Sequence, residues 1–303
     1  MVCCCVLGFI VVTLQCCSQS RLKPIGSIDN PIKLYFTPSI DADEISSVSE
    51  RFIKLLEKES GYFFKSAIPT SYMVIVEAFG TQRCDVALMN SFGYLLANQK
   101  YGAEARLRIL RNGEGFYRGE IIAHEDSGIK KLKDIQGKKF AFTDPSSTSG
   151  YLLPLKLFKE NDIGLGQHVF AMKHDNVAVM VYQKKVDAGA CFYSPPDKSG
   201  KIKDARSRII TQFPDVEERV KIIAVTDAIP NDPFVFRKDL PEEVKQKVSE
   251  SIMRVISTEE GKRSFYEIYS ADGVVQADDK DYDSLRELLR FTGKNSEELM
   301  GEK

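Results

Sequence analysis

Short apolar runs alternate with amphipathic segments along most of this chain. Each run ends in a polar turn, and in the segment that follows it the apolar side chains recur every three or four residues, as in a helix with one buried face. Strand, helix, strand, helix at such spacing predicts parallel strands covered by helices on both faces. The strands predicted in the first half are residues 32–36, 63–68 and 85–89, each followed by a helix.

The alternation starts again in the second half, which predicts a second lobe. Strands at 107–111 and 117–124 lead into it. Its predicted elements are strands 140–142, 169–172, 188–192 and 220–225 and helices 148–160 and 177–184. Amphipathic helices near 241–257, 259–268 and 279–291 follow and are expected to cover the first lobe.

We therefore expect an α/β fold with two lobes, each a mostly parallel sheet flanked by helices, joined by two hinge crossovers. Lobe 1 would consist of residues 31–119 plus 226–303, and lobe 2 of residues 120–225. The cleft between such lobes is the default ligand site. A single continuous sheet is the alternative.

The composition allows a sizeable core and gives no sign of nucleic-acid binding. The chain has 303 residues, of which 43% are hydrophobic and 28% charged, and its formal net charge is −1. No basic stripe with interleaved aromatic residues occurs, and the charges at 201–208 and 237–247 alternate with acids or lie on predicted helix faces. We expect no nucleic-acid partner.

The N-terminus is typical of an export signal. Residues 1–17, MVCCCVLGFIVVTLQCC, are apolar, too short to span a bilayer comfortably, and followed by a polar linker. We interpret residues 1–20 as a signal peptide or lipoprotein signal, in which Cys16 or Cys17 would carry the lipid. The basic start of a signal is missing, and Gln15 stands where a small residue is usual. An uncleaved anchor is the alternative and gives the same topology, with the body outside the cytoplasmic membrane.

The remaining cysteines and the histidines predict no metal site and no disulfide. Five of the seven cysteines lie in the first 17 residues, which leaves Cys84 and Cys191 in different predicted lobes as buried thiols. The three histidines, His124, His168 and His174, show no metal-ligand spacing. We expect neither a metal nor a cofactor.

The stretch FAFTDPSSTSGYLLPLKLF at 140–158 carries the clearest local chemistry. It reads as a strand, a turn and a helix start with four hydroxyl residues, 146–149, followed by Gly150. The first amides of a helix have no partner inside it, so this end suits an anion. The alternative is an ordinary N-cap, although one hydroxyl would suffice for that. Loops 37–41, 69–72 and 90–91, the last of which contributes Asn90, follow strands at the edge where ligands bind in parallel sheets.

Three motifs in this order resemble those of the phosphonate, phosphite and phosphate substrate-binding proteins of ABC transporters, the PhnD-like group. They are DPSSTSGYLLP at 144–154, KHDNVAV at 173–179 followed by VDAGA at 186–190, and IPNDPF at 229–234. The similarity extends from about residue 32 to 275. It implies a periplasmic-binding-protein fold of type II, in which two lobes close over a bound phosphorus oxyanion.

The resemblance also implies a ligand-binding set. The positions that match the family's ligand-binding residues are Tyr72, Tyr117, Ser147, Thr148, Ser149, His174 and Asp232. Fixed hydroxyls and helix amides could bind a tetrahedral anion reversibly without full cations buried beside it. His174 could donate from either tautomer. The alternatives are a capping or surface histidine, core tyrosines with an exposed rim, and an aspartate that only forms a turn.

Asp232 and Ser194 bear on which ligand is bound. A carboxylate near an anion is repulsive, so Asp232 would accept from a P–OH group or pair with a ligand ammonium, and in the first case fully deprotonated sulfate should be rejected. Where aminoethylphosphonate-binding members have an acid that helps to hold the ligand's amine, this chain has Ser194. A small ligand, namely phosphate, phosphite or a short alkylphosphonate, is therefore favoured.

The resulting expectation is a monomeric solute-binding protein, periplasmic or at the cell surface, that delivers its ligand to an ABC permease. The alternative is a sensor whose cleft reports the same ligand to a membrane receptor or kinase. An enzyme is not expected, because G-x-S-x-G is absent and no acid–base partner is placed near Ser149 by the sequence.

Overall fold

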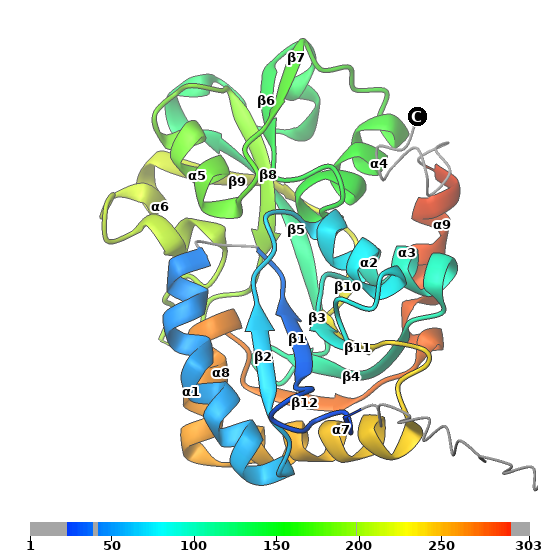
Figure 1. Ribbon diagram of the computed structural model, residues 1–303. Helices are drawn as coiled ribbons and strands as arrows, with labels where there is room; N and C mark the ends of the chain where they lie inside the picture. The colour runs from blue at the N-terminus through cyan, green and yellow to red at the C-terminus, as the bar shows by residue number, and fades with distance from the viewer. Residues whose placement is uncertain (1–22, 39–41, 198, 292–303) are drawn as a thin grey trace, which may run out of the picture.

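The computed structural model describes residues 23–38, 42–197 and 199–291 (Figure 1). Within that part the chain forms two lobes, each built on a six-stranded sheet. The strand order is β12-β4-β11-β3-β1-β2 in the first sheet and β10-β5-β8-β6-β7 in the second, where β9 also pairs with β5. The predicted signal, with Cys16 and Cys17, lies outside the described residues, as does most of loop 37–41.

The first sheet lies between two groups of helices. Its strands are β1 (Ile32–Phe36), β2 (Phe64–Ala67), β3 (Val86–Leu88), β4 (Glu104–Leu110), β11 (Pro233–Phe236) and β12 (Gly273–Gln276). One face packs on α1 (Ala42–Ser60), α7 (Glu242–Ser257) and α8 (Glu259–Tyr269), and the other on α2 (Tyr72–Gly80) and α3 (Ser91–Tyr101). Strand alternation assigns the two faces, since Val86 and Leu88 join one core and Ala87 the other.

The second sheet is covered in the same way. Its strands are β5 (Phe116–His124), β6 (Lys139–Phe142), β7 (Gln167–Phe170), β8 (Ala188–Tyr193), β9 (Val220–Val225) and β10 (Ile229–Pro230). The helices α5 (His174–Tyr182) and α6 (Val216–Arg219) and the 3₁₀ turn Ala205–Ile209 lie on one face, and α4 (Leu153–Glu160) lies on the other. The predicted two-lobed fold with helix-flanked sheets is thus confirmed.

The sheets are mixed, whereas the sequence predicts mostly parallel ones. The trios β2-β1-β3 and β7-β6-β8 are parallel, but β11 runs antiparallel to β3 and β5 antiparallel to β8. β12 also runs opposite to the parallel strands, since it pairs antiparallel with β4. β11 and β5 enter their sheets directly from the other lobe. They therefore start at the edge where the parallel strands end, which forces the opposite direction.

The two crossovers lie side by side. Residues 111–115 lead from β4 to β5, and residues 226–232 lead from β9 through β10 to β11. β10 pairs antiparallel with β5, with Ile229 opposite Tyr117, and the Asn231 amide donates to the Gly115 carbonyl at 2.9 Å. The predicted boundary after residue 119 falls inside β5, and the division into lobe segments stays a prediction.

The last helix differs from the expectation that it covers only the first lobe. α9 (Asp283–Phe291) contacts both α3 and α4. Its Leu285 and Leu288 share one core cluster with Leu152 and Leu153 of the second lobe. The sequence shows an amphipathic face but not which surface covers it.

Two further findings concern the cysteines and the possibility of a membrane-spanning helix. Cys84 and Cys191 are buried free thiols, as predicted. No helix in the described ranges is both long enough and apolar enough to cross a membrane.

Candidate functional site

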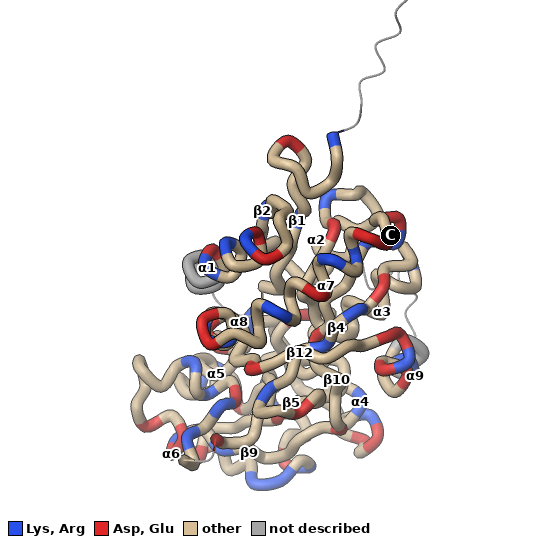
Figure 2. Tube along the Cα trace, turned by 90° about the horizontal axis from the view of Figure 1, so that it is seen from below, with Lys and Arg blue, Asp and Glu red and all other residues tan. Residues whose placement is uncertain are grey.

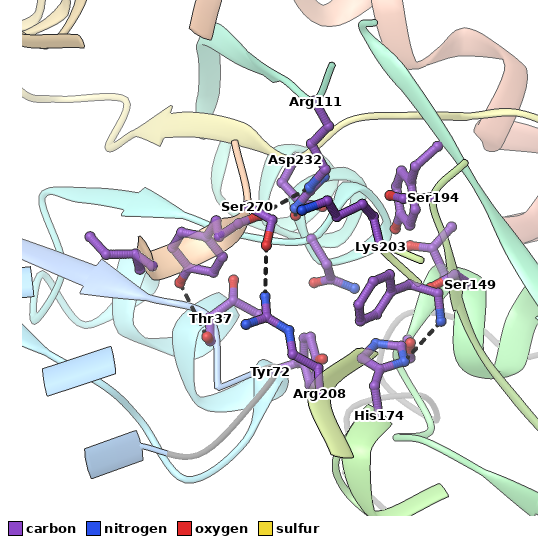
Figure 3. A pocket seen from close by; sticks show the side chains of 17 residues that line it. Thr37, Tyr72, Arg111, Ser149, His174, Ser194, Lys203, Arg208, Asp232 and Ser270 are labelled. Carbon is purple, nitrogen blue, oxygen red and sulfur yellow. Dashed lines mark hydrogen bonds and ion pairs between the residues drawn. The ribbon is translucent and has the colours of Figure 1, made fainter. Parts of the chain in front are cut away.

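A cavity of about 60 Å³ lies between the two lobes, where strand ends of both sheets meet (Figure 3). All the ligand-binding candidates predicted from the sequence line it, namely Tyr72, Asn90, Tyr117, Ser147, Thr148, Ser149, His174 and Asp232. The lining residues that the sequence analysis does not single out as ligand-binding candidates are Thr37, Arg111, Phe192, Ser194, Lys203, Arg208, Ile268, Tyr269 and Ser270. The loops at the carboxyl ends of the parallel strands thus converge on one site.

The helix start that faces this cavity is a π-helical turn, Thr148–Leu152, ahead of α4. Pro154 explains it, because a proline has no N–H to donate to the carbonyl of Gly150 four residues earlier. That carbonyl instead accepts from the amide of Thr143 at the end of β6, at 3.1 Å. The turn is thereby fixed to the sheet, and its first amides, which have no acceptor within the helix, remain for an anion.

Two of the four hydroxyls serve the turn itself. The Ser146 hydroxyl donates to the Asp144 carboxylate at 2.6 Å. The Ser147 hydroxyl accepts from the Gly150 amide at 3.1 Å and is the N-cap. The capping alternative therefore describes Ser147 correctly, and capping uses one lone pair of this hydroxyl without using its hydrogen.

The other two hydroxyl residues, Thr148 and Ser149, line the cavity, and Thr148 also contacts the opposite lobe. The Thr148 hydroxyl accepts from the Phe92 amide at 3.1 Å, so its hydrogen is still available. Burial raises the pKa of the Tyr117 phenol, and the Ser149 and Thr148 hydroxyls lower it by a smaller amount. Both residues line the cavity, so their hydroxyl groups are placed to contact a ligand.

Gly150 has a different role from the predicted one. A Cβ at this position would lie 2.2 Å from the Thr143 hydroxyl, so the missing side chain allows a close approach to β6 rather than to a ligand. The Thr143 hydroxyl donates to the Ala190 carbonyl at 3.1 Å and lies 3.2 Å from Nδ1 of His174. One threonine thus connects the helix start, the sheet and the histidine.

His174 is held in one neutral tautomer. The Phe192 amide donates to Nδ1 at 3.2 Å, so Nδ1 is the bare nitrogen and the proton sits on Nε2, the atom left to donate into the cavity. Burial lowers the pKa of His174 to about 3, and the charges of Arg208 and Arg111 add to the shift. The prediction that either tautomer could donate is therefore wrong.

The two predicted tyrosines both reach the cavity as protonated phenols. Burial raises the pKa of Tyr72 well above its ordinary value, and the carboxylates of Asp144 and Asp232 add to the rise. Burial likewise raises the pKa of Tyr117. Tyr72 begins α2 in the first lobe, whereas Tyr117 lies on β5 at the crossover, so only the first comes from within lobe 1.

Asp232 already has a cationic partner, which the sequence analysis misses. Nη2 of Arg111 donates to its Oδ2 at 3.1 Å, and Nη1 of Arg111 donates to Asn231 Oδ1 at 3.1 Å. Burial raises the pKa of Asp232, while Arg111 opposes this rise. Arg111 is the first residue after β4, and this position at a strand's carboxyl end is the signal that could have identified it.

The expectation of a site without buried cations is corrected by three lining residues. Besides Arg111, Lys203 and Arg208 reach the wall from residues 201–208, whose charges the sequence analysis describes only as alternating with acids or lying on predicted helix faces. The Arg208 guanidinium donates to the Ser270 hydroxyl at 3.1 Å, and Lys203 Nζ donates to the Tyr266 hydroxyl at 3.1 Å. Both contacts join the lobes. No periodic pattern marks this segment, so only the tertiary structure reveals it.

Asn90 joins the lobes on another side of the cavity. It is 6% exposed, and its Nδ2 donates to the Ser146 carbonyl at 2.8 Å. Together with the hydrogen bond from the Phe92 amide to the Thr148 hydroxyl, this contact links the first lobe to the helix start in the second lobe. The structure therefore shows the cavity enclosed by both lobes.

The donor set suits an anion rather than a metal ion. Hydroxyls, helix amides, an imidazole N–H and guanidinium groups dominate the wall, and among the described residues no group of three or more His, Cys, Asp or Glu side chains could hold a metal. Figure 2 shows basic and acidic residues interspersed along the chain. Since the chain's formal net charge is only −1, anion affinity would have to come from this local site.

The chain resembles known transport proteins in sequence. The family described as "ABC transporter, phosphonate, periplasmic substrate-binding protein" matches residues 34–282. A phosphate-import protein PhnD of Mycolicibacterium smegmatis is 27% identical over 284 residues, which is 86% of each chain. A phosphonates-binding periplasmic protein of Escherichia coli is 26% identical over 219 residues, 70% of this chain and 62% of that protein.

The fold has close counterparts among solved structures. A binding-protein component of an ABC phosphonate transporter from Pseudomonas aeruginosa superposes with a TM-score of 0.76 at 22% identity, covering 89% of this chain and 87% of that chain. PhnD1 of Prochlorococcus marinus, solved with methylphosphonate, has a TM-score of 0.74 at 18% identity, covering 87% and 98%. At these identities the likeness shows the fold alone.

Proposed function

We propose that the cavity captures a small phosphorus oxyanion for a membrane permease, because the chain belongs to the family of periplasmic substrate-binding proteins of phosphonate ABC transporters. One observation carries the choice of ligand. The turn that begins at Thr148 presents its first amides and the hydroxyl residues Thr148 and Ser149 to a cavity that both lobes enclose. Family membership favours transport over the alternative of a sensor.

The size of the cavity supports a small ligand. A buried water needs about 10–15 Å³ of such space, so a cavity of about 60 Å³ holds roughly four to six water-sized groups. A tetrahedral ion with four atoms around phosphorus fits, with little room beyond a methyl group. The relatives named for phosphate import and phosphonate binding, and the one solved with methylphosphonate, are in line with this range.

Capture proceeds by closure of the two lobes about the paired crossovers, in a monomer. The contacts of Asn90 with Ser146 and of Phe92 with Thr148 form only when the lobes meet, so an ion that bridges the lobes would favour the closed form. The body would be held outside the cytoplasmic membrane by the N-terminal segment, lipidated at Cys16 or Cys17.

A ligand panel tests this proposal. Phosphate, phosphite, methylphosphonate, aminoethylphosphonate and sulfate are titrated by calorimetry into the protein without residues 1–20. At least one phosphorus oxyanion is expected to bind, and sulfate about ten- to a hundredfold more weakly, because it has no hydrogen for the Asp232 carboxylate and leaves two acceptors facing each other. If no phosphorus compound binds, the proposed function is wrong.

A further inference from the structure

Arg111 is fixed more completely than a residue that only lines a cavity would need to be. Its Nε donates to the Tyr269 carbonyl at 3.2 Å, its Nη1 to Asn231 and its Nη2 to Asp232, each at 3.1 Å. Its guanidinium also lies over the Tyr117 ring, 5.6 Å from the centroid. Each guanidinium nitrogen thus makes one hydrogen bond to the protein, so three of the five N–H donors are used and the group is fixed against Asp232.

The acceptors of Arg111 are themselves fixed by the crossovers. Asn231 is fully buried, and its Nδ2 donates to the carbonyls of Ile109 at 3.1 Å and Glu114 at 2.8 Å. Asp232 follows Asn231 directly, at the point where the second crossover enters the first sheet. The carboxylate and the guanidinium therefore meet in a geometry set by both crossovers.

Asp232 presents one oxygen to the cavity. Arg111 occupies Oδ2, while Oδ1 has no hydrogen-bond donor among the residues that the structure describes, and the side chain lines the cavity (Figure 3). Burial alone would favour the neutral acid, and the guanidinium favours the carboxylate. A neutral acid could donate to any oxyanion, whereas a carboxylate can only accept.

We propose that Arg111 is a positioning residue that determines which oxyanions bind in the cavity. Arg111 holds Asp232 as a carboxylate, and the free oxygen of this carboxylate can only accept a hydrogen bond. A ligand must therefore offer it an oxygen that carries a hydrogen. This inference rests on the proposed function and adds a selection rule to it. Phosphate keeps a P–OH group up to strongly alkaline pH. Methylphosphonate loses its last P–OH near neutrality, and sulfate has none.

The other groups around Asp232 do not replace Arg111 in this role. The titratable and charged side chains that face it from the surrounding elements are Tyr72, Tyr117, Tyr269 and Tyr282, together with His174, Lys203 and Arg208 in the cavity wall. The phenols are protonated and His174 is neutral. Arg111 is the cation that hydrogen-bonds directly to this carboxylate among the described residues.

Two substitutions and a matched control test the rule. Arg111→Met should raise sulfate affinity relative to phosphate about tenfold or more at pH 7, with the gain lost as pH rises through the pKa of Asp232. Asp232→Asn should raise the ratio of sulfate affinity to phosphate affinity at every pH, because an amide N–H donates regardless of pH.

Arg108→Met is the control. Like Arg111, Arg108 pairs with a carboxylate, that of Asp281 at 3.3 Å, and lies over an aromatic ring, that of Phe116. Unlike Arg111, it does not line the cavity. It should leave the ratio unchanged.

The wild-type protein offers an independent readout. Its affinity for methylphosphonate should fall by up to about tenfold per pH unit above the ligand's second ionisation, while its affinity for phosphate stays level. In Asp232→Asn the fall for methylphosphonate should disappear. If Arg111→Met does not fold, the Asp232→Asn variant and this pH profile of the wild type still test whether Asp232 selects ligands as a carboxylate.

The outcomes separate this inference from the proposed function. A wild-type protein that binds no phosphorus oxyanion refutes the function itself. A protein that binds phosphate and sulfate equally well, or whose sulfate-to-phosphate ratio is unchanged in Asp232→Asn and in folded Arg111→Met, keeps the function and refutes the role of Arg111.

Discussion

Replacing Thr148 and Ser149 together by alanine is expected to weaken binding of a phosphorus oxyanion by about 2 to 6 kcal/mol. Each lost hydroxyl donor costs about 1 to 3 kcal/mol when its acceptor stays buried. Both residues are almost fully buried and line the cavity, so water would not easily replace them. Calorimetric titration with the tightest ligand of the panel measures the loss.

A neighbouring serine provides the matched control. Ser146 belongs to the same run of hydroxyl residues, but its hydroxyl bonds to Asp144 and it is not part of the cavity wall. Ser146→Ala should therefore change affinity far less than the double variant, even if it lowers stability. Equal affinities of the wild type and of a folded double variant for the ligand would show that these hydroxyls at the helix start do not contribute to binding.

The second large effect concerns the stability of the ligand-free protein in acid. The folded protein keeps His174 neutral down to a pKa of about 3, whereas the unfolded chain binds a proton below about pH 6.5. The unfolded state therefore holds more protons in this window, and stability falls as the pH drops through it. At about 1.4 kcal/mol per pH unit, His174 should cost about 3 kcal/mol between pH 6.5 and pH 4.

Urea unfolding of the wild type and of His174→Gln at several pH values isolates this contribution. The buried acids Glu120, Asp144 and Asp232 have raised pKa values and favour folding in acid, so only the difference between the two proteins is informative. That difference should shrink by about 3 kcal/mol from pH 7 to pH 4. A difference that stays constant with pH would show that His174 is not held neutral by the fold.

The sequence predicts the elements of this fold better than their directions. Alternating apolar runs and amphipathic segments are local signals, so β1 to β3 and α1 to α3 are predicted close to their observed positions. The antiparallel course of β5 and β11 depends on which edge of the sheet the chain enters from, and β12 at Gly273–Gln276 is missed altogether. Such features follow from long-range packing rather than from local pattern.

The residues that line the cavity likewise divide into those marked by local sequence signals and those placed by long-range packing. The hydroxyl run at 146–149 and the loop residue Asn90 are local signals, and the resemblance to a family supplies Tyr72, Tyr117, His174 and Asp232. The structure brings all of them except Ser146 together in the cavity wall. Arg106 and Arg108 on β4 are of the same residue type as Arg111, and only the place of Arg111 directly after the strand distinguishes it from them. Lys203 precedes the 3₁₀ turn Ala205–Ile209 and Arg208 lies within it, and the packing of the second lobe positions both side chains.

The most direct test of the central claim follows the backbone amides of Thr148 and Ser149 by nuclear magnetic resonance while methylphosphonate or phosphate is added to isotopically labelled protein. If the ion docks on this helix start, both amide protons should move strongly downfield and saturate with the affinity that calorimetry gives. If the ion binds while these two amides stay unmoved, the site lies elsewhere and the account is wrong.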